Sequence, residues 1–301
     1  MRKWLRRLGY LVGVLLILII VAGGVAYLIG EGKLNKVYTI PAHSITVPTD
    51  QASIAEGKRL ATVRDCTSCH TENLSGKLLT DNPMIGTIYT ANLTTGAGGV
   101  GSKLIDADMV MAIRHGVGPD GKPLIAMPAN FYVNLSDEDV SKIIAYIRSV
   151  PPVNNNVPRP IMSFPGKIIV GLGLLPAEAL PAEFIDHTAV ISSPQPSISV
   201  EYGKYLAATC AGCHNPSFSG GPIPFAPATN PHPANLTPGG ILANWSDVDF
   251  IHFFRTGTGP DGRAIDPQYM PWKTLGQMTD NELKALLLYL KSLPAKTTGI
   301  Q

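Results

Sequence analysis

Apolar residues follow three patterns along the chain. The first is an unbroken run from Leu8 to Gly30 without a charged side chain, and about 20 such residues cross a membrane as a helix. The second is an apolar spacing typical of helices that leads up to a cysteine, at 54–66 and again from Val200. The third is an apolar stripe between a hydroxyl cap and a proline, at 136–150 and 279–293. These patterns predict an all-α chain, with a glycine at 57 and at 203 that would permit another helix to approach closely.

The polar segments between the predicted helices occur twice. This self-similarity predicts two copies of one domain. We expect a cytoplasmic basic end and transmembrane anchor at 1–30, a tether at 31–49, a first domain at 50–152, a Pro-rich linker at 153–198 and a second domain at 199–301. The repeated blocks are Ala91-Asn92-Leu93-Thr94 and Ala234-Asn235-Leu236-Thr237, Arg114 to Gly121 and Arg255 to Gly262 (both R-x-G-x-G-P-D-G), and Met127-Pro128 and Met270-Pro271.

The linker contains an apolar run from Ile168 to Leu175. Its flanking lysine, its two glycines and its short length argue against a membrane span. A buried strand, a short helix over a ligand cleft and a contact with the membrane surface remain open.

The distribution of charged residues predicts on which side of the membrane the amino terminus lies. The net charge is +2, from 24 basic and 22 acidic residues. Four of the basic residues precede the apolar run, so the remainder is close to neutral and gives no basic patch for nucleic acid. The positive-inside rule puts the basic end in the cytoplasm and everything after Glu31 on the periplasmic side. A cleaved signal peptide ending at Gly24-Val25-Ala26 is the alternative, but its apolar region is typically about 7–15 residues long, and we expect a retained single-pass anchor in the cytoplasmic membrane.

All four cysteines of the chain lie in two short motifs, Cys66-Thr67-Ser68-Cys69-His70 and Cys210-Ala211-Gly212-Cys213-His214. A C-x-x-C-H run is the attachment signature of a c-type haem: the thiols add across the vinyl groups, and the histidine binds the iron. A zinc site made of two C-x-x-C pairs usually has them roughly 15–20 residues apart, far closer than here. A thioredoxin-like pair needs no histidine. We therefore expect two covalently bound haem c groups, with His70 and His214 as iron ligands.

The sixth iron ligand decides whether a haem transfers electrons or reacts with a substrate. Met127 and Met270 occupy matched Met-Pro positions after the glycine-rich loops, and we predict that both bind iron. Other methionines and histidines have no counterpart of their own type in the other copy, and we interpret the histidines as surface or structural residues. They are Met84, Met109, Met111, His115, His232 and His252.

Three further side chains are candidates for haem contact. Arg114 and Arg255 have a guanidinium suited to a haem propionate, or they anchor the glycine-rich loop instead. Trp272 follows the second Met-Pro pair and is placed to pack on the edge of the second haem, where the first copy has Ala129.

Together, these motifs resemble the class I-type cytochromes c. More narrowly, the chain is similar to the cytochrome c subunits of membrane-associated alcohol and sugar dehydrogenases, and its plan of one anchor and two haems is similar to the dihaem subunit of cbb3-type oxidases. The resemblance covers about residues 50–152 and 199–296. It implies a helical fold around each haem and electron transfer outside the cytoplasmic membrane. The implied partners are a dehydrogenase, a quinol-oxidising complex or an oxidase, with membrane lipid around the anchor.

Three functions are compatible with this plan. The first is an electron carrier that transforms no substrate itself and passes single electrons to a terminal acceptor. The second is a dihaem enzyme of the peroxidase or thiosulfate-oxidising type. Such an enzyme needs an open or low-potential haem, whereas both copies keep the Met-Pro pair. The third is a haem subunit of a larger respiratory or photosynthetic complex, which copurification in mild detergent would distinguish from the first.

Overall fold

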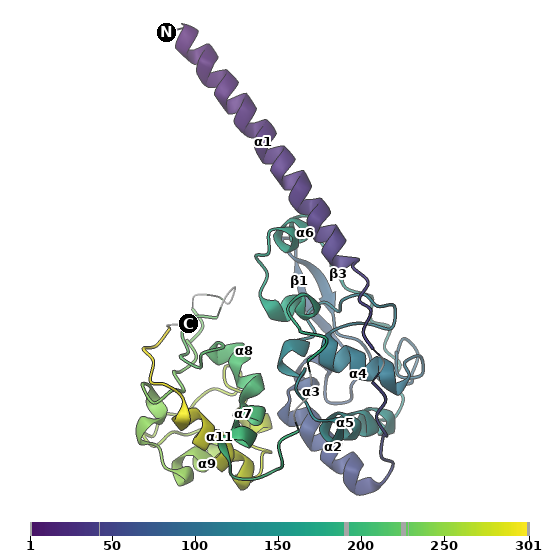
Figure 1. The fold of residues 1–301 in the computed structure, drawn as a ribbon, viewed down its shortest axis with the longest axis vertical. Coiled ribbons are helices and arrows are strands. Elements are labelled where there is room, and N and C mark those ends of the chain that lie inside the picture. Colours follow the sequence, from purple (N-terminus) through teal and green to yellow (C-terminus); the bar gives the residue numbers. More distant parts are fainter. Residues whose placement is uncertain (1, 42, 190–192, 224–226, 228, 300–301) are drawn as a thin grey trace.

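A computed structural model describes residues 2–41, 43–189, 193–223, 227 and 229–299. One long helix, α1 (Arg2–Leu34), projects from the rest of the molecule (Figure 1). The first repeat (50–152) contains α2 (Gln51–Val63), α3 (Cys66–His70), α4 (Asp106–His115), η1 (Ala129–Phe131) and α5 (Asp137–Ser149). The second repeat (199–301) contains α7 (Val200–Ala207), η4 (Ala208–Cys210), α8 (Ala211–His214), η5 (Ile241–Asn244), α9 (Asp247–Thr256), α10 (Trp272–Leu275) and α11 (Asp280–Ser292).

In each repeat the first helix crosses the last at a glycine. A Cβ on Gly57 would lie 1.8 Å from the carbonyl oxygen of Lys142, and one on Gly203 would lie 2.0 Å from that of Ala285. The backbones of α2 and α5, and of α7 and α11, therefore touch in a way that no larger residue permits. This confirms the close approach predicted from the two glycines.

The predicted helix at 54–66 is displaced. Helix α2 starts at Gln51 because the Asp50 carboxylate accepts a hydrogen bond from the backbone N–H of Ser53 at 2.9 Å. It ends at Val63, and Asp65 then adopts a left-handed conformation with φ 65°. The chain turns there, so the haem motif begins on a separate short helix.

The closing helices α5 and α11 carry the predicted apolar stripes inward. Ser136 and Thr279 cap them by accepting from the N–H of Asp139 and Glu282. The stripe residues are at most 1% exposed, and they are Val140, Ile143, Ile144, Leu283, Leu286, Leu287 and Leu290. Each repeat therefore forms its core against its last helix.

A small antiparallel sheet departs from the all-α prediction. Its strands are β1 (Leu78–Asn82), β2 (Gly86–Tyr89) and β3 (Ile161–Met162), in the order β1-β2-β3. Strands β1 and β2 follow the first haem motif, and β3 comes from the linker. A turn at Asn82 closes the hairpin, where the Met84 N–H donates to the Asn82 side chain at 2.8 Å. These strands are too short to give a periodic signal in the sequence.

The linker forms a third structured region, with α6 (Phe164–Gly171), η2 (Ala177–Ala179) and η3 (Pro181–Glu183). The run from Ile168 begins inside α6, so a short helix is present, but it lies against α1 and not over a ligand cleft as that alternative proposed. It packs against the end of α1 (Figure 1). A Cβ on Gly30 would meet the Lys167 carbonyl oxygen at 1.8 Å, and one on Gly171 would meet that of Ala26 at the same distance.

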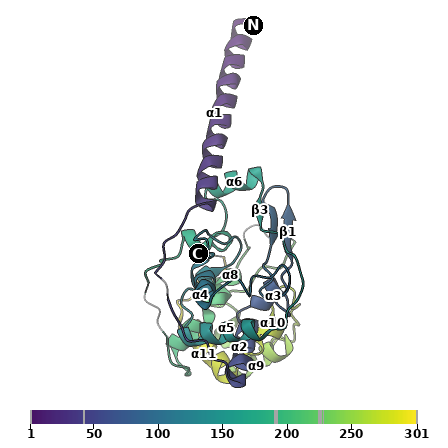
Figure 2. The same cartoon turned by 90° about the vertical axis from the view of Figure 1, so that its right-hand side faces the viewer.

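The two repeats share side chains across their boundary. Tyr205 of the second repeat packs on the core of the first, and Val63 of the first lies in the core of the second. The Arg59 guanidinium donates to both carboxylate oxygens of Glu282, at 2.8 and 2.9 Å. Turned by 90°, the repeats overlap below α1, and α3 and α8 lie at similar heights (Figure 2).

Candidate haem-binding sites

Both C-x-x-C-H motifs lie on a short helical segment directly after a helix that packs into the core. The first occupies α3, and the second spans the end of η4 and α8. Burial raises the pKa of Cys66 to about 12 and that of Cys210 to about 11. The first cysteine of each motif packs against the core of its own repeat.

The two motif histidines have the same hydrogen bond. Nδ1 of His70 lies 2.8 Å from the Ala91 carbonyl oxygen, and Nδ1 of His214 lies 2.7 Å from that of Ala234. A carbonyl oxygen only accepts, so Nδ1 carries the proton and Nε2 keeps its lone pair. Burial also lowers the pKa of both imidazoles, which favours the neutral form. This is the state in which histidine binds a metal through Nε2 while a second group orients the ring.

The repeated Asn-Leu-Thr block explains how the carbonyl is positioned. In the first repeat, the Asn92 side-chain oxygen accepts from the Thr94 N–H and hydroxyl, at 3.0 and 2.8 Å. Its amide donates to the Val153 carbonyl at 2.8 Å. The second repeat matches it, because Asn235 bonds Thr237 in the same way and donates to Lys296 at 2.7 Å. The block thus ties the residue that holds each histidine to the chain leaving the closing helix.

The two Met-Pro loops share a turn at each end but differ between them. A tight turn follows α4 and α9, with Gly121 at φ 74° and Gly262 at φ 77°. Pro128 has φ −79° and ψ 57°, and Pro271 has φ −77° and ψ 55°. The carbonyl of each methionine accepts from the N–H two residues later at 2.7 Å. Between the turns the second loop is two residues longer, and Ala126 before Met127 has a left-handed φ of 61°.

Each methionine shares a core with the cysteine of its own motif. Met127 and Cys66 pack on the core of the first repeat, and Met270 and Cys210 pack on that of the second. All four side chains are half-buried. The structure therefore brings one thiol and one thioether to the same core in each repeat, and the approach of the motif histidine to the methionine stays a prediction. The donor types fit a haem iron with nitrogen and sulfur ligands.

Arg114 and Arg255 occupy equivalent places and connect α4 or α9 to the closing helix. Arg114 donates to the Leu135 carbonyl at 2.6 Å and to the Asp137 carboxylate at 2.7 Å. Arg255 donates to the corresponding Met278 and Asp280, at 2.9 and 2.6 Å. These contacts anchor the start of the closing helix and not the glycine-rich loop, so neither of the two predicted roles is confirmed. Nη1 of Arg114 is buried without a hydrogen-bond partner in the described part of the chain, and a propionate contact stays a prediction.

Trp272 belongs to the glycine-rich loop of its own repeat. Its indole N–H donates to the Ile265 carbonyl at 2.9 Å, and its ring lies against Gly257, where a Cβ would meet it at 2.3 Å. Ala129, its counterpart, is fully buried. The predicted contact between the indole and a haem edge remains a prediction.

His115 is structural, as interpreted from the sequence, and has a partner that the sequence did not indicate. Its Nδ1 lies 3.1 Å from Nδ1 of His187 in the linker. His187 donates through Nε2 to the Ala182 carbonyl at 3.1 Å, so its own Nδ1 accepts from His115. His232 and His252 are exposed.

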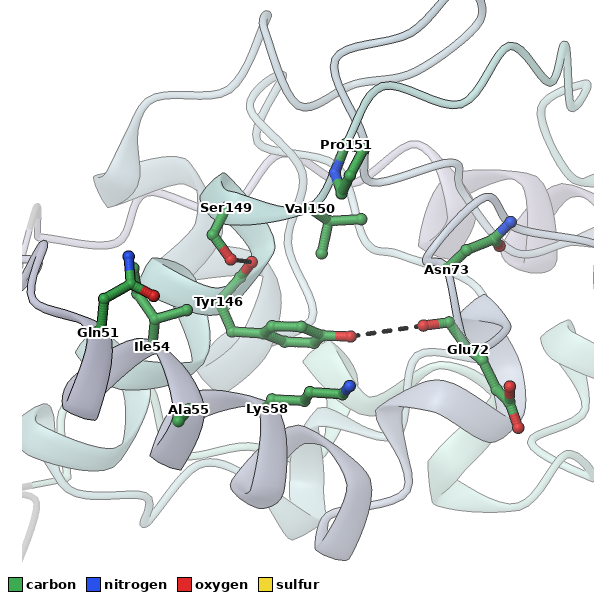
Figure 3. Close-up of a pocket in the computed structure, with 10 residues that line it drawn as sticks. All are labelled: Gln51, Ile54, Ala55, Lys58, Glu72, Asn73, Tyr146, Ser149, Val150 and Pro151. Carbon is green, nitrogen blue, oxygen red and sulfur yellow. Dashed lines mark hydrogen bonds between the residues drawn. The ribbon is translucent and has the colours of Figure 1, made fainter.

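A surface hollow lies between α2 and α5 (Figure 3). Tyr146 crosses it, and its hydroxyl donates to the Glu72 carbonyl at 3.4 Å. The ten residues that line it include no motif cysteine, histidine or methionine. The hollow is therefore separate from both candidate sites.

Sequence reasoning missed the residues between the repeats. The aromatic ring of Phe131 lies 3.0 Å from the position of a Cβ on Gly212, inside the second motif. Arg64 and Asp65 sit on the other side of the boundary, directly before the first motif. A signal was present: Cys66 lies six positions after Leu60, but Cys210 lies only four positions after Leu206. The additional residues include the charged pair.

Comparison with known proteins agrees with this geometry. A family model described as cytochrome c matches residues 54–151 and 200–294. The fructose dehydrogenase cytochrome subunit of Gluconobacter japonicus is 32% identical over 87% of this chain and 57% of its own length. The gluconate 2-dehydrogenase cytochrome c subunit of Pantoea cypripedii is 30% identical, over 82% and 61%. The cytochrome c subunit of the quinone-dependent alcohol dehydrogenase of Gluconobacter oxydans is 29% identical, over 83% and 56%.

The chain spans somewhat more than half the length of these relatives. Its similarity covers both repeats and both motifs. The chain belongs to the cytochrome c family.

Proposed function

We propose that this chain is a membrane-anchored electron-transfer subunit that carries two covalently bound haem c groups outside the cytoplasmic membrane. The observation that carries the proposal is the duplicated histidine geometry. Two imidazoles, each after a C-x-x-C pair, have Nδ1 bonded to a backbone carbonyl and Nε2 left for iron. Membership of the cytochrome c family implies covalent haem c.

The residues divide into matching roles. In each motif the two thiols would add their S–H bonds across the porphyrin vinyl groups, at Cys66 and Cys69 and at Cys210 and Cys213. His70 and His214 would bind iron on one side, and Met127 and Met270 on the other. Haem iron supplies a one-electron couple between its ferric and ferrous states. With both axial positions filled, substrate has no vacant coordination site, which favours electron transfer over catalysis.

The relatives favour a dehydrogenase as redox partner. Their names describe cytochrome subunits of fructose, alcohol and gluconate dehydrogenases. By analogy, this chain would accept electrons from such a dehydrogenase or a quinol-linked complex and pass them to a terminal acceptor. Its own role would be non-catalytic, with substrate oxidation on the partner.

Helix packing joins the end of α1 to the folded structure. Ala26, the last residue of the candidate cleavage site, and Gly30 beyond it are buried against α6. The Glu31 carboxylate pairs with Lys167 at 2.6 Å, and Tyr27 stacks on Phe164 with ring centroids 5.0 Å apart. The last turns of α1 are therefore part of the folded structure, while residues 8–25 are largely exposed and apolar. Cleavage after Ala26 would remove Ala26 alone from this contact, and Tyr27, Gly30 and Glu31 would remain. We retain the anchor because the uncharged run at 8–30 is longer than the apolar region of a signal peptide.

Intact mass spectrometry of the denatured protein tests the proposal. The full chain should carry the mass of two haems and retain residues 1–30. The double variant C210A/C213A should carry one, and C66A/C69A should carry the other. A wild-type chain with a single haem would contradict the two-site proposal, and a chain that begins near residue 27 would contradict the anchor.

A further inference from the structure

Arg64 lies at the boundary between the two repeats, two residues before the first motif. It follows the last residue of α2, and only 1% of it is exposed. Its Nη1 donates to the carbonyl oxygens of Tyr205 and Leu206 in α7, at 3.4 and 3.3 Å. The guanidinium carbon lies 4.9 Å from the centre of the Tyr205 ring. A cation from the first repeat is thus enclosed by a helix of the second.

This charge lacks the compensation that buried arginines normally have. Arg64 forms no ion pair in the described part of the chain, and its Nε and Nη2 are buried without a hydrogen-bond partner there. Arg59, one turn earlier on α2, shows the usual arrangement, because it pairs with Glu56 and Glu282. A buried charge is costly unless it is paired. The structure nevertheless keeps Arg64 in place.

Arg64 is close to both motifs. Its positive charge lowers the pKa of the Cys66 thiol and that of the Cys210 thiol, in both cases against the larger rise that burial causes. The motifs also approach each other elsewhere. Phe131 contacts Gly212, and burial together with the negative charge of Asp65 raises the pKa of Cys213. The first cysteines of the two motifs therefore share one positive neighbour in a dry boundary.

We infer that Arg64 is a shared positive charge that raises the reduction potential of both haems. The inference rests on the proposed function. Each haem gains one negative charge on reduction, and an uncompensated cation in a medium of low dielectric constant favours that change. Because Arg64 lies near both motifs, one side chain would act on both couples. Arg64 would not bind iron itself. It would act on each haem only through its charge.

The test is an optical redox titration of the purified full-length protein. Arg64→Gln should lower both midpoint potentials, each by about a tenfold change in the reduction equilibrium, or 59 mV for a one-electron couple. Arg64→Lys keeps the charge and should retain most of each potential. A fall confined to one haem, or an equal fall in the lysine variant, would overturn the inference.

Two controls separate charge from packing. Lys58→Gln removes an exposed charge from the same helix and should leave both potentials unchanged, because water screens it. The double variant R59Q/E282Q removes the ion pair between the repeats without altering net charge. It should lower the denaturation midpoint but not the potentials. A fall in potential as large as that of R64Q would assign the effect to loosening of the boundary and overturn the inference.

Asp65→Asn supplies a test that does not depend on how Arg64→Gln folds. Asp65 places the opposite charge beside Cys66 and Cys213, so its removal should raise both potentials. If both midpoint potentials were unchanged in D65N, a charge at the boundary between the repeats would not influence the haems, and the inference would be contradicted. Intact mass spectrometry of the denatured protein counts the haems, and it therefore tests the proposed function separately from the role of Arg64. Fewer than two haems on wild type would refute the proposed function, whereas two haems with potentials indifferent to Arg64 would refute this inference alone.

Discussion

The two Met-Pro pairs make the same backbone turn but have different surroundings. In the first repeat the linker covers the loop. The Ala126 N–H donates to the Ala179 carbonyl at 2.9 Å, and Pro181 packs against Gly116. In the second, Tyr269 is 43% exposed, and the loop has no such cover among the described residues. Arg114 is fully buried, whereas its counterpart Arg255 has 36% of its side chain exposed. Repeated sequence therefore fixes the local geometry, and the unrepeated linker decides which site faces solvent.

The largest expected effect comes from exchanging the proposed sixth ligands. Met127→His should lower the potential of the first haem and leave the second unchanged, and Met270→His should do the reverse. Imidazole favours ferric iron relative to a thioether, and the expected fall is roughly 0.1–0.3 V within the ~0.8 V that axial ligands span. Optical redox titration resolves the two couples. If either variant moved the other haem, the two sites would not be the independent units described above.

Substituting the buried asparagine of each repeat, Asn92 or Asn235, shows how much it contributes to the free energy of unfolding. Asn92→Ala should destabilise the chain by about 2–3 kcal/mol, because it leaves the buried Thr94 N–H unpaired and removes the amide donor to the Val153 carbonyl. Asn235→Ala should cost somewhat less, about 1–2 kcal/mol, since Asn92 also donates to Asn155 at 3.2 Å. Denaturant unfolding followed by circular dichroism measures both. Asn134→Ala, at an exposed position without a side-chain hydrogen bond in the described part of the chain, is the control and should change stability by less than about 0.5 kcal/mol. Equal costs would remove this difference between the repeats.

A smaller effect is expected on how stability depends on pH, and it arises from His115 in the first repeat, whose loop the linker covers. Burial and the neighbouring His187 charge lower the pKa of His115 to about 4, and Arg114 and His43 act in the same direction. The unfolded chain takes up the proton first as pH falls, near the ordinary histidine pKa of about 6.5. Stability from the neutral pair is complete above that value and declines toward pH 4. After solvent screening the loss is on the order of 1 kcal/mol. Denaturant midpoints between pH 7 and 4.5 should fall in wild type and less in His115→Gln.

Sequence reasoning was most successful where the chemistry is local or repeated. The closing stripes of α5 and α11 and the close contacts at Gly57 and Gly203 follow from short-range patterns, as does membership of the cytochrome c family, which the two C-x-x-C-H motifs indicated. It was least successful where contacts join distant segments. The pairing of β3 with the hairpin, the packing of α6 on α1 and the His115–His187 pair depend on a linker that has no second copy. Arg64 shows the same limit, because its importance comes from α7, which lies far away in the sequence.

The central claim is that both irons are closed by methionine, and carbon monoxide binding to the reduced native protein tests it most directly. The account predicts that neither ferrous haem binds the gas readily in wild type. Met270→Ala should bind one equivalent quickly, and Met127→Ala should bind one more slowly, because the linker covers the first loop. Rapid stoichiometric binding to one haem of the native protein, without denaturant, would contradict the account and favour a dihaem enzyme.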